Sequence, residues 1–286
     1  MKIYIRPTVS IIGAILIVLM LRASYWQWER HLFKQSYIHT MGERLQQPIA
    51  ALDSVINASP AEVSYRRVQI EGDFDFDHEI VLRNRSLDGA AGVHVLTPLK
   101  FNGNTTRLIV DRGFIPLEKS QKSDRALFRK DPHVNFVGLI KETVAPSSWL
   151  AKLLAPADPP SGEGRPWVDA WLRVDLEKIS KQLPYAVLPF YVETMPSTES
   201  AEAEKQIVKA GTGREEMLFM GLRDPAVDSR APRALADYPV PAFDTVIPPG
   251  RHLGYVYEWA LMAVMTFLIC WVLQLKPRRS SAGAGS

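Results

Sequence analysis

The sequence has almost no cysteine: Cys270 is the only one among 286 residues, and it lies in an apolar run near the C-terminus. An intramolecular disulfide is therefore impossible, and no CxxC pair or Met-rich tract is present to carry copper. A nucleophile elbow, a Walker loop, a dinucleotide fingerprint and an HExxH helix are also missing. Because no nucleophile–base pair can be named, we expect a protein that is not an enzyme.

An excess of charge of one sign is lacking as well. The 34 Lys and Arg residues nearly balance the 31 Asp and Glu residues, which leaves a formal net charge of +3 at pH 7. No block of basic residues and no nucleic-acid-binding motif accompanies this small excess. We therefore expect no nucleic acid among the partners of this protein.

Two apolar runs stand at the ends of the chain. Residues 7–21 carry no charge, and continuing to Trp26 supplies the roughly 20 residues that a helix needs to cross a bilayer. The second run, residues 253–275, is long enough on its own. We expect transmembrane helices over residues 7–28 and 252–275, with one domain over residues 29–251 between them. For the first run, a cleaved signal peptide remains the alternative.

The residues that flank these runs predict their orientation, because basic side chains favour the cytoplasmic side. Basic residues precede the first run and follow the second: Lys2, Arg6, Lys276, Arg278 and Arg279. Aromatic residues gather at the opposite end of each run: Tyr25, Trp26, Trp28, Tyr255, Tyr257 and Trp259. We therefore expect a multi-pass protein with both termini in the cytoplasm and the middle domain outside it, in the periplasm or the intermembrane space.

The middle of the chain has the pattern of a β-rich domain. Strand-like stretches occur at residues 65–72, 79–84, 92–99, 107–116, 133–140 and 188–194. The sequence Asn102-Gly103-Asn104 is typical of a hairpin, and residues 171–183 suit a short helix. We expect an extracytoplasmic α+β domain built on an antiparallel sheet or a small barrel. Residues 196–250 are polar and then Pro-rich, which favours helical, disordered or irregular structure.

One group of acidic residues follows the first predicted strand. In an extended chain, Asp73, Asp75, Asp77 and Glu79 share one face, since side chains alternate along a strand. Their spacing does not fit an EF-hand, which needs a Gly and a terminal Glu. We expect this face to be solvated.

Among the six histidines, His252 has a distinctive position at the start of the second apolar run. A neutral imidazole there suits a haem iron, and the neighbouring Arg251 suits a propionate. The alternative interpretation is a polar cap at the membrane interface. No other histidine lies beside a predicted span except His31 and His39, which follow the first one.

These features occur in an order that resembles the surfeit-locus-one family of cytochrome c oxidase assembly proteins, known from bacteria and mitochondria. The residues that carry the resemblance span nearly the whole chain: Trp26, Gln27, Arg30 and Lys34; Tyr65, Arg67, Val68 and Gly72; Gly92, Thr97, Pro98 and Leu99; Val110, Arg112, Gly113 and Pro116; Trp171, Arg173 and Asp175; Pro189, Phe190 and Tyr191; His252, Leu253, Tyr255 and Trp259. Ser24 and Phe114 depart from the family pattern, which usually has Gly and Trp there.

The resemblance implies an assembly factor, or chaperone, in a bacterial inner membrane that helps to insert haem a into the catalytic subunit of a haem-copper oxidase. It implies His252 as the iron ligand. Arg251 and Arg30 lie at the same depth in the predicted membrane, and we expect them to pair with the propionates. A haem synthase is a further expected partner, beside the lipid bilayer. The remaining motif residues are expected to be structural or partner-facing: Trp26, Gln27, Lys34, Tyr65, Gly72, Pro98, Arg112, Gly113, Tyr255 and Trp259. The alternatives are a scaffold that binds no haem and a membrane-anchored envelope enzyme.

Overall fold

The computed structural model describes residues 2–3, 6–87, 89–143, 158, 161–162, 164–195, 234–241 and 249–276. It divides into two compact units. The first joins the two ends of the chain, residues 1–39 and 246–286, and the second comprises residues 40–245. The expectations for residues 196–233 and 242–248, for Arg278 and Arg279, and for the side chain of Arg251 lie outside the described part.

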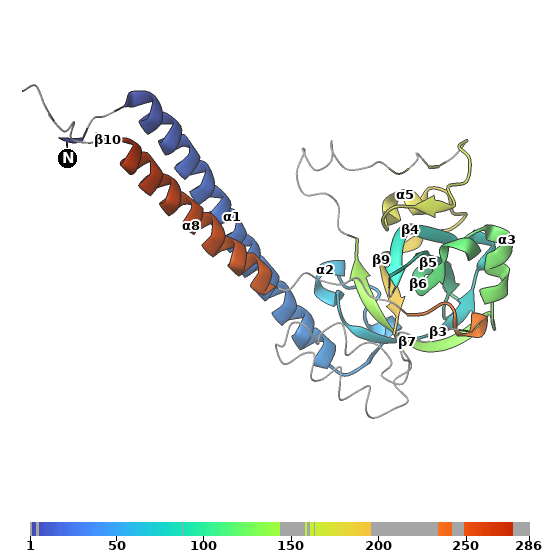
Figure 1. The fold of residues 1–286 in the computed structure, drawn as a ribbon. Helices are drawn as coiled ribbons and strands as arrows, with labels where there is room; N and C mark the ends of the chain where they lie inside the picture. Colours follow the sequence, from blue (N-terminus) through green and yellow to red (C-terminus); the bar gives the residue numbers. More distant parts are fainter. Residues whose placement is uncertain are drawn as a thin grey trace, which may run out of the picture. The chain divides into compact units, whose positions relative to one another are not determined.

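Two helices, α1 (Pro7–Gln46) and α8 (Pro249–Leu273), make up most of the first unit (Figure 1). Their contacts pair early residues of α1 with late residues of α8, so the helices run antiparallel. Ser10 Oγ lies 3.1 Å from Gln274 Nε2, while Ser24 Oγ donates to the Val256 carbonyl at 2.9 Å. Beyond the helices, the short strands β1 (Lys2–Ile3) and β10 (Leu275–Lys276) pair antiparallel. The two described ends of the chain therefore lie at the same end of the helix pair.

Both helices are long and apolar enough to cross a membrane, as judged by length and composition. The sequences that meet this test are Pro7–Gln46 and His252–Leu273. Their large apolar side chains point outward instead of into a core; Val18 is 64% exposed and Leu261 is 62% exposed. Continuous apolar surface of this kind is unfavourable in water and is typical of a lipid-facing helix. Helix α1 extends beyond the expected span, to Gln46.

The second unit is built on a closed barrel. Its five strands are β3 (Arg67–Phe74), β5 (Ala90–Lys100), β6 (Arg107–Pro116), β7 (His133–Glu142) and β9 (Val187–Thr194). They pair in the order β3-β7-β9-β6-β5, and a further pairing of Asp73 and Phe74 with Lys100 and Leu99 closes the ring. The expected β-rich domain is confirmed, and of the two expected forms the barrel is present. One pair, β6–β9, is parallel.

Shorter elements extend the barrel. Strand β4 (Ile80–Leu87) pairs with β5, while β8 (Ala170–Trp171) and β2 (Ala50–Ala51) add to the two edges of the sheet. The described residues also form three short α-helices, α2 (Pro60–Val63), α3 (Lys122–Arg125) and α5 (Leu176–Ser180), and several single-turn 3-10 helices. Apolar side chains from the five barrel strands fill the interior, including Val68, Leu99, Val110, Ile140 and Val192. The expected hairpin at Asn102-Gly103-Asn104 joins β5 to β6, and the expected short helix is α5.

The expectation of one solvated acidic face is wrong. Strand β3 ends at Phe74, and a 3-10 turn over Phe76–His78 changes the direction of the chain before β4 begins. The four acids therefore do not share a strand face. Glu79 is fully buried, whereas the others remain nearer the surface. The alternation of acidic and apolar residues continues through this turn, so the sequence pattern does not distinguish the turn from an extended strand.

Candidate functional site

His252 lies in the first turn of α8 and contacts Gln27 of α1. Its Nδ1 is 2.9 Å from Gln27 Oε1. One helical turn away, Ser24 donates to the carbonyl of Val256 at 2.9 Å, and Ser24 is buried. These two contacts join the antiparallel helices on successive turns, so they fix the position of the His252 ring along α1. The structure thus brings together two motif residues that are 225 positions apart in sequence.

Cationic side chains follow Gln27 along α1. Arg30 and Lys34 lie three and seven residues later, which places them on the same side of the helix as Gln27. The Arg30 guanidinium stands 5.4 Å from the centre of the Phe33 ring, and the Lys34 ammonium stands 5.7 Å from that of Tyr37. Within the described residues, no ion pair joins Arg30 or Lys34 to a carboxylate. Their charge can therefore meet an anionic group brought by a ligand.

Aromatic residues surround this part of the helix pair. Trp26 and Tyr255 are half exposed, at 52% and 45%, and Trp28 packs 5.8 Å from the ring of His31. Amphipathic rings of this kind belong at a lipid–water interface. The expected belts therefore coincide with the His252–Gln27 contact. Trp259 lies almost two turns further along α8 and is partly buried.

The chemistry of this region fits a haem better than a bare metal ion. Among the described residues, no group of three or more His, Cys, Asp and Glu side chains is close enough to hold a metal. A single imidazole, cations that can meet carboxylates, and exposed apolar helix surface are what a haem needs for axial ligation, propionate pairing and burial of the ring. His31 is buried and lies close enough to His252 to interact with it electrostatically, whereas His39 is exposed.

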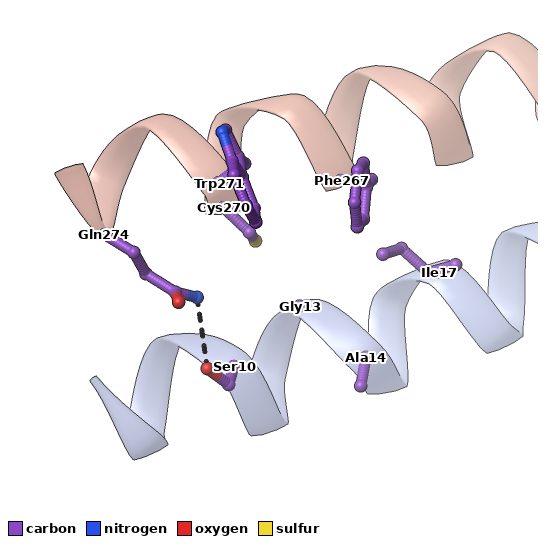
Figure 2. Close-up of a pocket in the computed structure, with 8 residues that line it drawn as sticks. All are labelled: Ser10, Gly13, Ala14, Ile17, Phe267, Cys270, Trp271 and Gln274. Carbon is purple, nitrogen blue, oxygen red and sulfur yellow. Dashed lines mark hydrogen bonds between the residues drawn. The ribbon is translucent and has the colours of Figure 1, made fainter. Parts of the chain in front are cut away.

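A cleft lies elsewhere between the same helices, toward their β1 and β10 ends (Figure 2). It has a volume of about 220 Å³. Its lining is mostly apolar and carries no charge: Ser10, Gly13, Ala14, Ile17, Phe267, Cys270, Trp271 and Gln274. Small-molecule sites usually enclose about 300–1,000 Å³ and hold a few directed polar groups. The cleft is therefore a poorer candidate site than the region of His252.

In the barrel, the motif residue Arg112 forms part of a buried ion cluster. Arg112 Nη1 donates to Glu79 Oε2 at 2.9 Å, and its guanidinium stands 5.1 Å from the centre of the Phe76 ring. Arg125 approaches the other oxygen of Glu79 at 3.4 Å and pairs with Asp169 at 2.6 Å. Glu79 and Arg125 are almost completely buried. The buried arginine therefore holds β6 to Glu79, the residue before β4, and does not face an open site.

Other motif residues of the barrel have backbone roles. Gly113 has a φ of +113° and sits at a bulge in β6, where β6 contributes one residue more than β5. A Cβ there would overlap the carbonyl of Val240, which pairs with Phe114. At Gly72, a Cβ would overlap the carbonyl of Lys100, where β3 meets β5 and the barrel closes. Pro98 accepts a hydrogen bond from Asp75 N through its carbonyl, and Tyr65 has a φ of +66° beside Lys141.

One buried pair was not anticipated from the sequence. His94 Nδ1 lies 2.9 Å from Asp111 Oδ2, and both side chains are more than nine-tenths buried. Burial alone would lower the pKa of His94, but the charge of Asp111 and the hydrogen bond to it raise the pKa above its usual value. In the sequence, His94 and Asp111 are each a polar residue within an otherwise apolar predicted strand. His94 and Asp111 belong to different strands, so their pairing required the register of β5 against β6.

Two candidate membrane-spanning helices and a closed barrel between them in sequence define the class: a membrane protein with a folded β domain in its central segment. The family model described as the SURF1 family matches residues 14–264, which covers the barrel and most of each helix. The chain therefore belongs to the SURF1 family. The resemblance read from the motifs is confirmed.

Individual relatives match the chain at lower coverage. A SURF1-like protein of Monosiga brevicollis is 25% identical over 156 residues, which are 51% of this chain and 58% of that protein. Surfeit locus protein 1 of Mus musculus is 25% identical over 174 residues, covering 54% and 52%. Surfeit locus protein 1 of Homo sapiens is 25% identical over 137 residues, and the match covers 41% of this chain and 44% of that protein. The chain thus spans about half the length of the curated relatives it matches.

Proposed function

We propose that this protein is an assembly factor for a haem-copper terminal oxidase and that it acts on the haem-bearing catalytic subunit. Its membership in the SURF1 family supports this class of function. The proposal includes no chemical turnover, because the family role is one of assembly. We further propose that the protein binds haem a at His252 and helps to insert it into that subunit.

The observation that carries the haem proposal is the placement of His252. It stands at the start of α8, and among the described residues its ring is hydrogen-bonded through Nδ1 alone, to Gln27. Haem a, when bound, supplies an iron that accepts one axial nitrogen and two propionates that need cations. In this proposal His252 Nε2 holds the iron, and Arg30 and Arg251 hold the propionates. A single protein ligand suits a donor, since the haem must leave again.

Surroundings of this kind also explain why a membrane protein would hold the haem. The macrocycle is apolar, and each buried CH₂ of such a group is worth about 0.8 kcal/mol. Exposed faces of α1 and α8 near Trp26 and Tyr255 provide apolar surface. Lipid and the two helices would together keep the ring out of water. The carboxylates would stay at the interface beside the cations.

The experiment compares purified wild type with His252→Ala after co-expression with haem-a synthesis. We expect a Soret band in the wild type and its loss in His252→Ala at equal protein yield. His133→Ala is the matched control, because His133 is an exposed barrel histidine paired with Asp73. A wild type that never carries haem, or a His252→Ala variant that carries as much as wild type, would leave the scaffold that binds no haem as the function.

A further inference from the structure

We infer that Gln27 is a positioning residue for His252: it holds Nδ1–H and thereby leaves the lone pair of Nε2 for the iron. This inference rests on the proposed haem site. It assigns a role to the contact between Gln27 Oε1 and His252 Nδ1 at 2.9 Å. An amide oxygen only accepts hydrogen bonds, so the imidazole nitrogen facing it carries the proton. In the neutral ring, the other nitrogen is then the one that can bind a metal.

The position of Gln27 is itself fixed by neighbouring contacts. Ser24 precedes it by one turn of α1 and donates to the carbonyl of Val256, which follows His252 by one turn of α8. Ser24 is buried, so this hydrogen bond is shielded from solvent. Two interhelical hydrogen bonds on successive turns prevent the helices from sliding past each other at this point. Gln27 therefore contacts the imidazole of His252 at a fixed position along the helix axis and sets the orientation of the ring.

The chemical type of the acceptor also matters. Histidines that bind metals usually donate their second N–H to a carboxylate, a carbonyl or water, and a carboxylate raises the basicity of the ring most. Gln27 offers a neutral oxygen. The ring is therefore oriented but less basic than one held by Asp or Glu, and its bond to iron is weaker. A weaker axial bond suits a protein that gives up its haem.

Two substitutions at position 27 separate these effects. Gln27→Leu removes the acceptor while keeping the apolar part of the side chain. Gln27→Glu keeps the geometry and replaces the neutral oxygen with a charged one. Gln35→Leu is the matched control, because Gln35 is an exposed glutamine on the same helix, about two turns away.

The first measurement uses the haem-free protein. The full chain is labelled with ¹⁵N-histidine in detergent micelles, and the ring signals of His252 are assigned by their loss in His252→Ala. We expect the Nδ1–H tautomer in wild type and in Gln35→Leu, and a shift toward the Nε2–H tautomer in Gln27→Leu. A wild-type ring that is protonated on Nε2 alone, as an amide in the opposite orientation would require, overturns the inference.

The second measurement uses the haem-loaded protein. We expect Gln27→Leu to weaken haem binding by about 10- to 100-fold and to lower the Fe–N(His) stretching frequency. Gln27→Glu is expected to raise that frequency and to lower the reduction potential of the iron, while Gln35→Leu matches wild type. If Gln27 only held the two helices together, both variants would change the protein yield. They would not shift the Fe–N(His) frequency in opposite directions.

The outcomes separate this inference from the proposed function. If His252→Ala loses haem while both Gln27 variants keep the affinity and spectra of wild type, Gln27 does not position the ligand and the haem site stands. If wild type never carries haem, the proposed haem site fails. The Gln27–His252 contact is then only a hydrogen bond between helices, and the positioning role is overturned with it.

Discussion

At the scale of single residues, the barrel depends on charges that lie in its interior. Glu79 has no exposed side-chain surface, and Arg112 has 8%. Removing one partner of a buried ion pair leaves the other charge uncompensated, which costs about 3–5 kcal/mol. We expect Arg112→Ala to lower the free energy of unfolding of the barrel by that amount, as measured by urea denaturation of the full chain in detergent.

The control for this prediction is an ion pair of similar length at the surface. Lys181 and Glu177 are 3.0 Å apart, with side chains 53% and 84% exposed. Exposed pairs contribute about 0–1 kcal/mol, so Lys181→Ala should change the free energy of unfolding by no more than that. Equal effects of Arg112→Ala and Lys181→Ala would contradict the assignment of Arg112 to a buried structural cluster.

The pair of His94 and Asp111 makes barrel stability depend on pH. Because the folded state raises the pKa of His94, the stabilising charge pair is fully present below the usual histidine pKa of about 6.5 and is lost as pH rises through the folded value. Arg85 opposes the protonated form, and Glu193 supports it. We expect the Tm of wild type to fall more between about pH 6 and pH 9 than the Tm of His94→Gln. Parallel Tm curves for the two proteins would show that the pair carries no linked proton.

The sequence predicted the candidate site more fully than the buried charges of the barrel. His252 and Gln27 belong to contiguous motifs beside apolar runs, so their position on the two helices could be read directly. Glu79 could not be distinguished from Asp73 or Asp77, because alternation along the chain says nothing about a turn that lies between them. Arg125 offered no pattern at all. Its burial depends on Asp169, which is 44 residues away.

At the scale of elements, the bulge of β6 joins the barrel to the segment around Val240. The N–H of Gly113 donates to Asp111 Oδ1 at 2.9 Å, and Phe114 exchanges two backbone hydrogen bonds with Val240. The positive φ of Gly113 and the nearby Val240 carbonyl both exclude a side chain. Gly113 is therefore required by the backbone geometry of the bulge and by the lack of space for a side chain, next to the buried Arg112.

A substitution at this bulge tests that interpretation. We expect Gly113→Ala to destabilise the barrel by more than the roughly 1–3 kcal/mol of a strained backbone alone, because steric overlap with Val240 adds to the strain. Gly103→Ala is the control, since Gly103 also has a positive φ but nothing lies within 4 Å of an added Cβ. Urea denaturation of both variants gives the comparison. A smaller effect at Gly113 than at Gly103 would show that the segment around Val240 moves away freely.

The strands themselves were largely predictable, but their closure was not. Apolar alternation and the hairpin at Asn102-Gly103-Asn104 place β3, β5, β6, β7 and β9 within a few residues of their observed bounds. Closure depends on Gly72, where the Lys100 carbonyl approaches the backbone of β3. The parallel pairing of β6 with β9 also joins residues about 80 positions apart. No local pattern encodes either contact.

At the scale of the whole molecule, the pairing of β1 with β10 places both described ends of the chain at one end of the helix pair. With basic flanks at Lys2, Arg6 and Lys276, we expect that end in the cytoplasm and residues from about 30 to 250 outside. Reporter fusions that are active only outside the cytoplasm check this. A fusion after Lys34 should be active and one after Arg279 inactive. The reverse result would show that the protein has the opposite orientation in the membrane.

The central claim is that this protein serves the assembly of a haem-copper oxidase, and haem in that oxidase is its most direct readout. The measurement is the haem-a difference spectrum of membranes from cells of the source organism that lack this protein and carry no other family member. The account predicts loss of most oxidase haem a, restored by wild type and not by His252→Ala at equal protein level. Normal haem-a content and oxidase activity in cells that lack the protein would contradict it.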